Sequence, residues 1–326
     1  MGNIMITETC NLSCPYCFAD EFVNVDHNEI TEANFSKALN FLLSGKRQNR
    51  RIGLIGGEPT LHTNFRSLLE EVKMREEVTS VLIFTNGTLI NETFDITANS
   101  KFNFLLNLNS PEIIGDYNFN TTMQNVEHLV SKLNKGRALT LGLNLYDPNM
   151  NCDFFVNAVK KFGLTHVRLS ITVPNQSDNG GFSKFSYLKN LVYSLYIQLM
   201  YEGVNIRFDC NMLPVCSWTN REYDKLSLFQ ANFGESRMGF NLNKNSCNPV
   251  IDILPDLTAV RCFGLSGISK MPISQFTDID ELNDYYKKAL DDKLVNIPSA
   301  NKCTACEMFV EKKCYGGCLA NKGSEC

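Results

Sequence analysis

Three cysteines near the start of the chain have the spacing of an iron–sulfur ligand set. Cys10, Cys14 and Cys17 form a Cys-x3-Cys-x2-Cys array within the stretch TCNLSCPYCF. Three thiolates at this spacing can close around one face of a [4Fe–4S] cube, whose four irons each take one further ligand. A structural cluster or zinc site normally fills its fourth position from the protein. The array therefore predicts a cluster with one iron open to a substrate or cofactor.

A zinc site is the alternative use of the same three cysteines. Zinc in a structural site takes four ligands, and His27 is the nearby residue that could complete the set. The four histidines of the chain show no ligand-like spacing, and we expect all of them to be structural. The iron–sulfur interpretation is therefore favoured.

Composition and charge exclude several classes of protein. The chain has 326 residues, of which 44% are hydrophobic, so one large domain or two moderate ones can form around a substantial core. The net charge of −4 gives no electrostatic reason for a nucleic acid or an anionic membrane as partner. The first eight residues lack the pattern of a signal peptide, and no apolar run reaches the roughly 18 residues of a membrane span. We expect a cytoplasmic protein.

The distribution of the cysteines points to metal or redox chemistry. Of the 13 cysteines, twelve fall in two zones, residues 10–17 and 210–326, and only Cys152 stands apart. Disulfides are disfavoured in a reducing compartment, and a disulfide scaffold would more often spread its cysteines along the chain. Two separate metal-binding regions are the better explanation.

Strand and helix patterns alternate through the first 203 residues. Short β-rich apolar runs alternate with segments of helical period, which predicts a parallel sheet covered by helices. About six such units fit in this region, and eight would close a full barrel, so the expected fold class is α/β with a partial (β/α)6 barrel. The expected strands are 3–7, 51–55, 80–84, 102–108, 138–145 and 167–173, and the expected helices are 31–44, 64–77, 121–135, 153–162 and 184–203.

Polar clusters follow several of these strands. Gly56-Gly57-Glu58-Pro59 (GGEP) follows the second strand and Thr85-Asn86-Gly87 (TNG) the third. In parallel sheets covered by helices, ligands bind at the carboxyl ends of the strands. GGEP alone could be an ordinary turn with proline at a helix start, and TNG alone is a common turn.

The cysteine array and GGEP together resemble the radical S-adenosylmethionine (SAM) enzymes. Tyr16 is an aromatic residue before the third cysteine, and a strand leads to GGEP about 40 residues further on. The resemblance covers residues 1–203. It implies that Cys10, Cys14 and Cys17 hold a [4Fe–4S] cluster whose remaining iron is chelated by SAM. It further implies reductive cleavage of SAM to a 5′-deoxyadenosyl radical, which abstracts a substrate hydrogen.

The resemblance also assigns SAM-binding residues. Gly56 and Gly57 would let the backbone approach the methionyl amine, and Glu58 would lie near that amine or order the loop. Tyr16 belongs to the same site. Arg168 could also be a simple solvated or paired arginine. The remaining SAM contacts implied, for the ribose, methionine or carboxylate, are Asn86, Asn144, Arg168 and Ser170.

The second cysteine zone resembles the SPASM extension of these enzymes, which carries two auxiliary [4Fe–4S] clusters. Two departures from its usual pattern are a spacing of x7 between Cys306 and Cys314 and a leucine, Leu257, in place of a glycine. A zinc ribbon or treble clef is the alternative, but seven to nine cysteines exceed one zinc site. The family's ligation would assign Cys303, Cys306, Cys314 and Cys326 to an outer cluster and Cys247, Cys262 and Cys318 to an inner one. The inner cluster could offer an open iron to substrate, or its fourth ligand could be Cys216 or, slightly less favoured, Cys210.

The expected domains are a barrel at 1–203, a bridging region at 204–246 and an auxiliary-cluster domain at 247–326. The leading hypothesis for function is the modification of a ribosomally made peptide, by a thioether or carbon–carbon crosslink or by side-chain oxidation. The alternatives are a small-molecule oxidoreductase or epimerase, a formylglycine-forming sulfatase maturase and, least favoured, a non-catalytic electron carrier.

The expected partners are a peptide or protein substrate and an electron donor of the flavodoxin or ferredoxin type. Cys10 lies so near the start that a leader-binding domain of about 80 residues has no room before it. Leader recognition is therefore expected from the barrel edge, from the region 175–245 or from a separate leader-binding partner. The catalytic acid, base or hydrogen donor is not identified, with Asp20, Asp209 and Cys152 as open possibilities.

Overall fold

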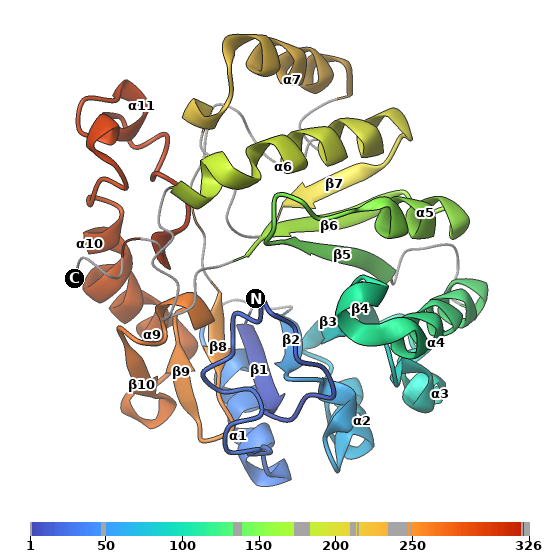
Figure 1. The fold of residues 1–326 in the computed structure, drawn as a ribbon. Helices are drawn as coiled ribbons and strands as arrows, with labels where there is room; N and C mark the ends of the chain where they lie inside the picture. Colours follow the sequence, from blue (N-terminus) through green and yellow to red (C-terminus); the bar gives the residue numbers. More distant parts are fainter. Residues whose placement is uncertain are drawn as a thin grey trace. The chain divides into compact units, whose positions relative to one another are not determined.

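The computed structural model describes residues 2–46, 50–132, 139–172, 183–208, 213, 215–233, 247, 250–320 and 322 (Figure 1). Its Cα packing divides the chain into two compact units. The first unit is Met1–Thr140 with Pro249–Ala289, and the second is Leu141–Asn248 with Leu290–Cys326. Each unit is therefore built from two separate stretches of chain. The domain boundaries expected from the sequence remain a prediction.

The first unit contains a seven-stranded part of the sheet in the order β10-β9-β8-β1-β2-β3-β4. The pairs from β1 to β4 are parallel, and β8 also pairs parallel to β1, while β9 and β10 continue the sheet in antiparallel pairs. Its strands are β1 (Gly2–Thr7), β2 (Arg50–Gly56), β3 (Val78–Thr85), β4 (Phe102–Asn107), β8 (Ile251–Ile253), β9 (Thr258–Val260) and β10 (Lys270–Pro272).

The helices α1 (Glu32–Leu43) and α2 (Phe65–Met74) pack against these strands through the apolar faces that the sequence shows (Figure 1). The Thr31 side chain begins α1 by accepting a hydrogen bond from the Asn34 amide at 3.2 Å, which satisfies one donor of the first turn. All six residues of β1 are buried, as is typical of a central parallel strand. This strand delivers the chain to the first cysteine array.

The other helical elements of the first unit are shorter or irregular. The helix predicted at 121–135 is the later part of α4 (Pro111–Lys132), which begins ten residues earlier than expected. Two helical segments of α4 are joined across a kink at Gly115, where φ is +78°. A glycine tolerates this left-handed backbone at little cost. The remaining elements are η1 (Pro59–Leu61), η2 (Ile90–Thr93), α3 (Phe94–Thr97), η5 (Phe263–Leu265), η6 (Ile273–Gln275), α9 (Ile279–Tyr286) and η7 (Lys287–Asp291), which ends in the second unit.

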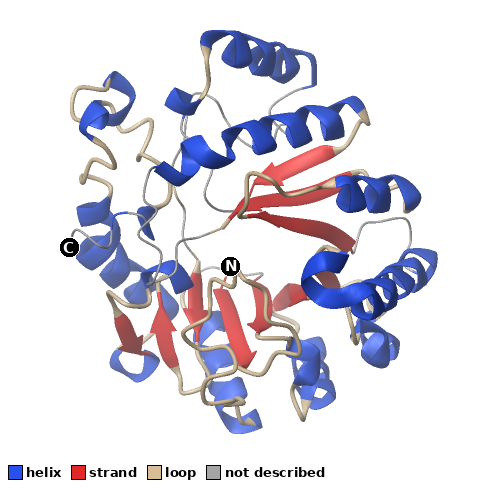
Figure 2. Ribbon diagram, viewed as in Figure 1, coloured by secondary structure: helices blue, strands red, loops and turns tan. Residues whose placement is uncertain are grey.

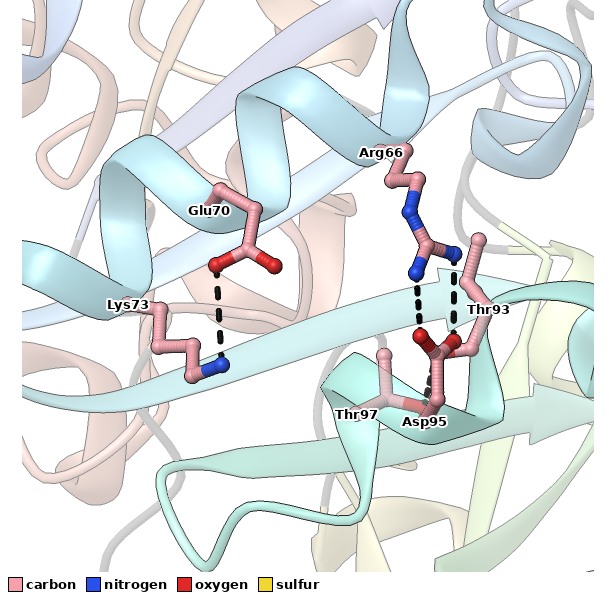
Figure 3. A network of polar contacts seen from close by, with 6 residues as sticks. All are labelled: Arg66, Glu70, Lys73, Thr93, Asp95 and Thr97. Carbon is pink, nitrogen blue, oxygen red and sulfur yellow. Dashed lines mark hydrogen bonds and ion pairs between the residues drawn. The ribbon is translucent and has the colours of Figure 1, made fainter.

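A polar network on the surface joins α2 to the segment that follows β3 (Figure 3). The Arg66 guanidinium donates to both carboxylate oxygens of Asp95, and Lys73 pairs with Glu70 at 3.5 Å. The Arg66 side chain holds the pKa of Asp95 below its usual range. Both Arg66 and Asp95 are well exposed, so the pair contributes little to stability.

The second unit contains the parallel strands β5 (Leu139–Leu145), β6 (His166–Ile171) and β7 (Asn205–Phe208) (Figure 2). Helix α6 (Ser183–Tyr201) packs against β7. The register places Asn144 of β5 beside Ser170 of β6. The remaining elements are α5 (Asp153–Lys161), η4 (Val215–Ser217), α7 (Asn220–Phe233), α10 (Asp292–Leu294), η8 (Asn301–Cys303) and α11 (Glu307–Val310).

The predicted fold class is confirmed. Strands β1 to β6 all lie within two residues of their expected bounds, and the protein has the α/β architecture of a partial barrel with a cysteine-rich carboxyl-terminal region. The sequence analysis missed β7 to β10, which have only three or four residues each. Runs this short carry too little periodicity to be recognised. Over the part of the chain that is described, no helix has both the length and the hydropathy of a membrane span.

A buried polar pair connects β1 with β8. The Asn3 side-chain amide donates to Asp252 at 2.6 Å, and both side chains are buried. Burial raises the pKa of Asp252 to about 7, against the lowering effects of Asn3 and of the Arg261 charge. Folding therefore favours the protonated form, and this contribution to stability is complete below the unfolded pKa and lost as the pH rises towards 7.

Replacement of Asp252 by asparagine should remove this pH dependence. The asparagine mimics the neutral acid, so D252N and the wild type should be similarly stable at pH 4, and D252N should be more stable by a few kcal/mol at pH 7.5. Urea unfolding of the metal-free protein at both pH values measures the difference. D256N, at an exposed turn residue, is the matched control and should show no such trend. If the difference in unfolding free energy between the wild type and D252N is the same at both pH values, the raised pKa of Asp252 is contradicted.

Candidate functional site

The first cysteine array lies in the loop that follows β1. Cys10, Cys14 and Cys17 are all partly buried, and the Cys17 amide donates to the Cys14 carbonyl at 3.1 Å. Burial, with a smaller effect from the charges of neighbouring cysteines, raises the pKa of Cys10 and of Cys14 to about 11. The three thiols are thus close enough to interact electrostatically. Three partly buried thiols gathered on one loop fit a cluster that takes three thiolate ligands.

An asparagine that the sequence analysis did not identify fixes the first of these cysteines. The Asn24 side chain accepts from the Cys10 amide at 2.7 Å and donates to the Cys10 carbonyl at 3.1 Å. The Asn24 amide itself donates to the Glu8 carbonyl at 2.8 Å. Asn24 has a φ of +59°, a conformation that asparagine adopts more readily than most residues. This clamp holds the backbone of the array from one side.

The GGEP turn holds the same loop from the other side. The Gly57 amide donates to the Thr7 carbonyl at 2.9 Å, and the Glu58 amide donates to the Thr9 carbonyl at 2.8 Å. A Cβ atom on Gly56 would lie 2.5 Å from the Thr7 carbonyl oxygen, and one on Gly57 would lie 2.4 Å from that of Thr9. The two glycines are therefore required for the contact between GGEP and the cysteine loop. Their predicted approach to the methionyl amine remains a prediction.

Glu58 orders the loops, which is one of the two roles expected for it. Its side chain is fully buried and accepts hydrogen bonds from the Thr60 amide and hydroxyl, the Thr85 hydroxyl at 2.8 Å and the Asn86 amide at 2.6 Å. Burial raises the pKa of Glu58, while these hydrogen bonds lower it. The carboxylate thereby joins GGEP to the TNG turn at the end of β3.

The TNG turn is also joined directly to the cysteine array. The Asn86 side-chain amide donates to Asn11 at 2.8 Å, and Asn11 in turn donates to the Thr88 hydroxyl at 2.9 Å. Thr88 closes the triangle by donating to Asn86 at 2.7 Å. Asn11 lies between Cys10 and Cys14, so the loop after β3 and the array are one hydrogen-bonded structure. Of these residues, sequence reasoning identified only Asn86.

Tyr16 has a defined partner in the first unit. Its hydroxyl donates a hydrogen bond to the side chain of Asn109, which is buried at the end of β4. Sequence reasoning did not identify Asn109 as a contact of the array. The hydrogen bond from Tyr16 thus connects the end of β4 to the cysteine loop, in addition to the ends of β1, β2 and β3.

Three of the predicted SAM contacts lie in the second unit. The Arg168 guanidinium donates to the Asn144 side chain at 3.0 Å, and both residues are buried. Ser170 is also buried and follows on the same strand. The structure brings these residues together on neighbouring strands, and their contact with SAM stays a prediction. Asp209, one of the possible hydrogen donors, lies outside the described residues.

The carboxyl-terminal cysteines are divided between the two units. Cys262 belongs to the first unit, whereas Cys216 and the later cysteines belong to the second. Cys303, Cys314 and Cys318 are buried, and the Gly316 amide donates to the Cys314 sulfur at 3.3 Å. Cys210 and Cys326 lie outside the described residues.

Electrostatic contacts place several of these cysteines together. Burial raises the pKa of Cys314, and the charges of Cys216, Cys303 and Cys306 raise it further. Cys216 is thus near the set predicted for the outer cluster, although the sequence analysis placed it in the inner one. Which cluster it joins stays a prediction. Cysteines that share a buried region fit thiolate ligation of a cluster.

The turn that contains Cys262 packs against the first cysteine loop. Cys262 directly precedes Phe263, whose ring lies 5.4 Å from that of Phe18 and 5.9 Å from that of Phe22. Cys17 packs against the same apolar cluster. Phe263, the residue after Cys262, and Cys17, a ligand expected for the first cluster, therefore pack in the same apolar cluster.

The zinc alternative finds little support in the geometry of the first array. His27 is exposed, and its Nδ1 lies 3.4 Å from the Thr9 hydroxyl. Among the described residues, no three His, Cys, Asp or Glu side chains surround a point where a single metal ion would be held. A [4Fe–4S] cube spreads its cysteines around a larger body than one ion does.

The fold and the site together define a class, a partial-barrel protein with a cluster-binding cysteine loop at the end of its first strand. Residues 4–149 match the family described as the radical SAM superfamily. The GTP 3′,8-cyclase of Chlorobaculum tepidum is 33% identical over 92 residues, which are 28% of this chain and 27% of the cyclase. The chain thus spans about a quarter of the length of the curated relatives it matches.

Solved structures extend the similarity over almost the whole chain. The structure of anSMEcpe with bound AdoMet and a Kp18Cys peptide has a TM-score of 0.67 at 17% identity, covering 97% of this chain and 88% of that one. Streptococcus suis SuiB bound to the precursor peptide SuiA has a TM-score of 0.65 at 18% identity, covering 98% and 71%. These SPASM-domain neighbours share the fold of this chain, including its cysteine-rich region.

Replacement of Gly57 by alanine should disrupt the first cluster. The added Cβ would collide with the Thr9 carbonyl and with Cβ of Cys10, so the cysteine loop must move. Iron analysis after anaerobic reconstitution should show a loss of about four irons per chain. G203A is the control, because Gly203 has a φ of +75° and open space around it. It should cost roughly 1–2 kcal/mol of stability and no iron. Full iron content in G57A would contradict this role of the glycine.

The change E58Q should weaken SAM binding. A glutamine amide has one acceptor oxygen, so either the Thr85 and Thr60 donors or the Asn86 amide loses its partner. Loss of one hydrogen bond would let the TNG turn move, so the affinity for SAM should fall roughly tenfold. Equilibrium dialysis of the reconstituted protein against SAM measures the effect. E71Q is the control, because the Glu71 carboxylate on α2 accepts a hydrogen bond from the Ser36 hydroxyl on α1, and it should bind SAM as the wild type does. Equal affinities of E58Q and E71Q would refute the role of Glu58.

Proposed function

We propose that this radical SAM enzyme modifies peptides. The observation that carries the proposal is the extent of the structural similarity. It runs through the cysteine-rich region as well as the barrel, and both neighbours compared above were solved with a bound peptide. Fold similarity at this level of identity shows a shared fold and no particular reaction, so the peptide substrate is what we propose.

In this proposal the first cysteine loop binds a [4Fe–4S] cluster and SAM. Cys10, Cys14 and Cys17 are the cluster ligands, and the cluster with SAM would supply a 5′-deoxyadenosyl radical that abstracts a hydrogen from the substrate. The contribution of the chain is to position the site. Gly57 and Glu58 fix the loop through main-chain hydrogen bonds to Thr7 and Thr9.

The carboxyl-terminal cysteines are proposed to hold two auxiliary [4Fe–4S] clusters. The ligands are those expected from the SPASM resemblance, with Cys216 near Cys314 as an additional candidate. Clusters in a protein interior suit electron transfer to or from a substrate radical. Thiolate-bound clusters persist in a reducing compartment, so a cytoplasmic location is part of the proposal. An electron donor of the flavodoxin or ferredoxin type completes it.

A second candidate function is radical chemistry on a small molecule. The match to GTP 3′,8-cyclases favours it, although that match spans only 28% of this chain. A formylglycine-forming maturase remains a variant of the peptide hypothesis. Each candidate uses the same first cluster, so the substrate distinguishes them.

The experiment combines product analysis with a ligand variant. Anaerobically reconstituted protein with SAM, dithionite and peptides encoded beside its gene should form 5′-deoxyadenosine and peptides of altered mass. C14A should form neither, because its first cluster has lost a ligand, while K160Q, at an exposed lysine paired with Glu202, should behave as the wild type. Mass spectrometry reads both products. Turnover of a nucleotide with no change in any peptide would overturn the peptide proposal and favour the second candidate.

A further inference from the structure

Lys322 is a lysine buried in the second unit. Only 1% of its surface is exposed, and its ammonium group donates to the Leu294 carbonyl at 3.1 Å. The same ammonium lies 5.3 Å from the centre of the Phe309 ring. Among the residues that the structure describes, no carboxylate pairs with it. A buried lysine without such a pair is unusual, because lysines are rarely fully buried unless paired.

The charge on Lys322 needs an anion nearby. Transfer of an ammonium group from water into a protein interior is costly unless an opposite charge compensates for it. One carbonyl oxygen and one ring face provide partial compensation only, since an ammonium has three donors. The structure therefore indicates that something negative occupies the surroundings of Lys322.

In the part of the chain that the structure describes, the charges that act most strongly on Lys322 are those of cysteines. Burial lowers the pKa of Lys322 to about 8, and the charges of Cys303, Cys314, Cys247 and Cys318 oppose this lowering. Neutral thiols would leave the ammonium uncompensated. Thiolates bound to a metal cluster carry negative charge at neutral pH, since metal ligation deprotonates the thiol.

The chain geometry supports the same association. Phe309 belongs to the short helix α11, whose first turn begins at Cys306, and the Phe309 amide donates to the Cys306 carbonyl at 3.0 Å. Lys322 follows Cys318 by four residues. The lysine thus lies among the segments that carry the cysteines, with its charged end turned inward.

We propose that Lys322 is the buried counterion of an auxiliary iron–sulfur cluster held by the cysteines of the second unit. This role of Lys322 requires the auxiliary clusters that are part of the proposed function. The ammonium stabilises the negative charge of the ligated cluster. Because reduction adds a further negative charge, it also raises the reduction potential of that cluster.

The test uses K322Q, which keeps a donor for the Leu294 carbonyl and removes the charge. K160Q is the matched control, because Lys160 is an exposed lysine on α5 paired with Glu202. Both changes are made in the full chain with Cys10, Cys14 and Cys17 replaced by alanine, so that only auxiliary clusters contribute to the spectra. Iron and sulfide analysis and an electron paramagnetic resonance titration with dithionite are the readouts.

The expected result is a midpoint potential that shifts to more negative values in K322Q and stays at the parent value in K160Q. An unchanged potential in K322Q would overturn the role of the lysine alone. If K322Q does not retain iron, K322R shows whether the cluster needs the positive charge, because arginine keeps the charge and changes the shape of the side chain. Iron retained by K322R supports the proposal, and iron lost by both variants overturns it. A parent protein without auxiliary iron, or with zinc in its place, would overturn the auxiliary clusters and the lysine together.

Discussion

The close backbone contact between GGEP and the first cysteine loop is the constraint on which the rest of the site depends. Two main-chain hydrogen bonds, from Gly57 to Thr7 and from Glu58 to Thr9, join the end of β2 to the loop after β1. They form only because positions 56 and 57 have no side chain. The buried Glu58 carboxylate then extends the connection to β3, and Asn11 and Asn86 close it. The ends of three neighbouring strands are thereby fixed around three thiols.

Much of this arrangement could be predicted from the sequence, because it depends on residue types at fixed spacings. The cysteine array, GGEP and the first six strands all have local signatures of this kind. Asn24, Asn11 and Asn109 were missed, since their roles come from hydrogen bonds between segments far apart in the chain. An asparagine in a loop looks the same whether it binds solvent or a distant backbone group. Lys322 was missed for the same reason, because burial of a lysine has no signature in one sequence.

One departure from the family pattern has a structural explanation. Leu257 takes the place of a usual glycine, and its φ of +69° is in the left-handed region that glycine favours. The turn between β8 and β9 is kept by hydrogen bonds, with the Leu257 amide donating to Leu254 and the Leu257 carbonyl accepting from Ile273. The backbone shape is thus retained at a cost in strain. The substitution changes the residue and leaves the turn in place ahead of Cys262.

We propose that SAM binds an iron of the first cluster directly, at the cysteine loop that GGEP holds. The electron paramagnetic resonance spectrum of the reduced, reconstituted wild-type protein before and after addition of SAM tests it most directly. Direct ligation changes the electronic environment of the cluster, so the account predicts a clear change in the signal of the first cluster on addition of SAM. That signal should be absent from a variant in which Cys10, Cys14 and Cys17 are alanine. A spectrum that SAM leaves unchanged would contradict the account.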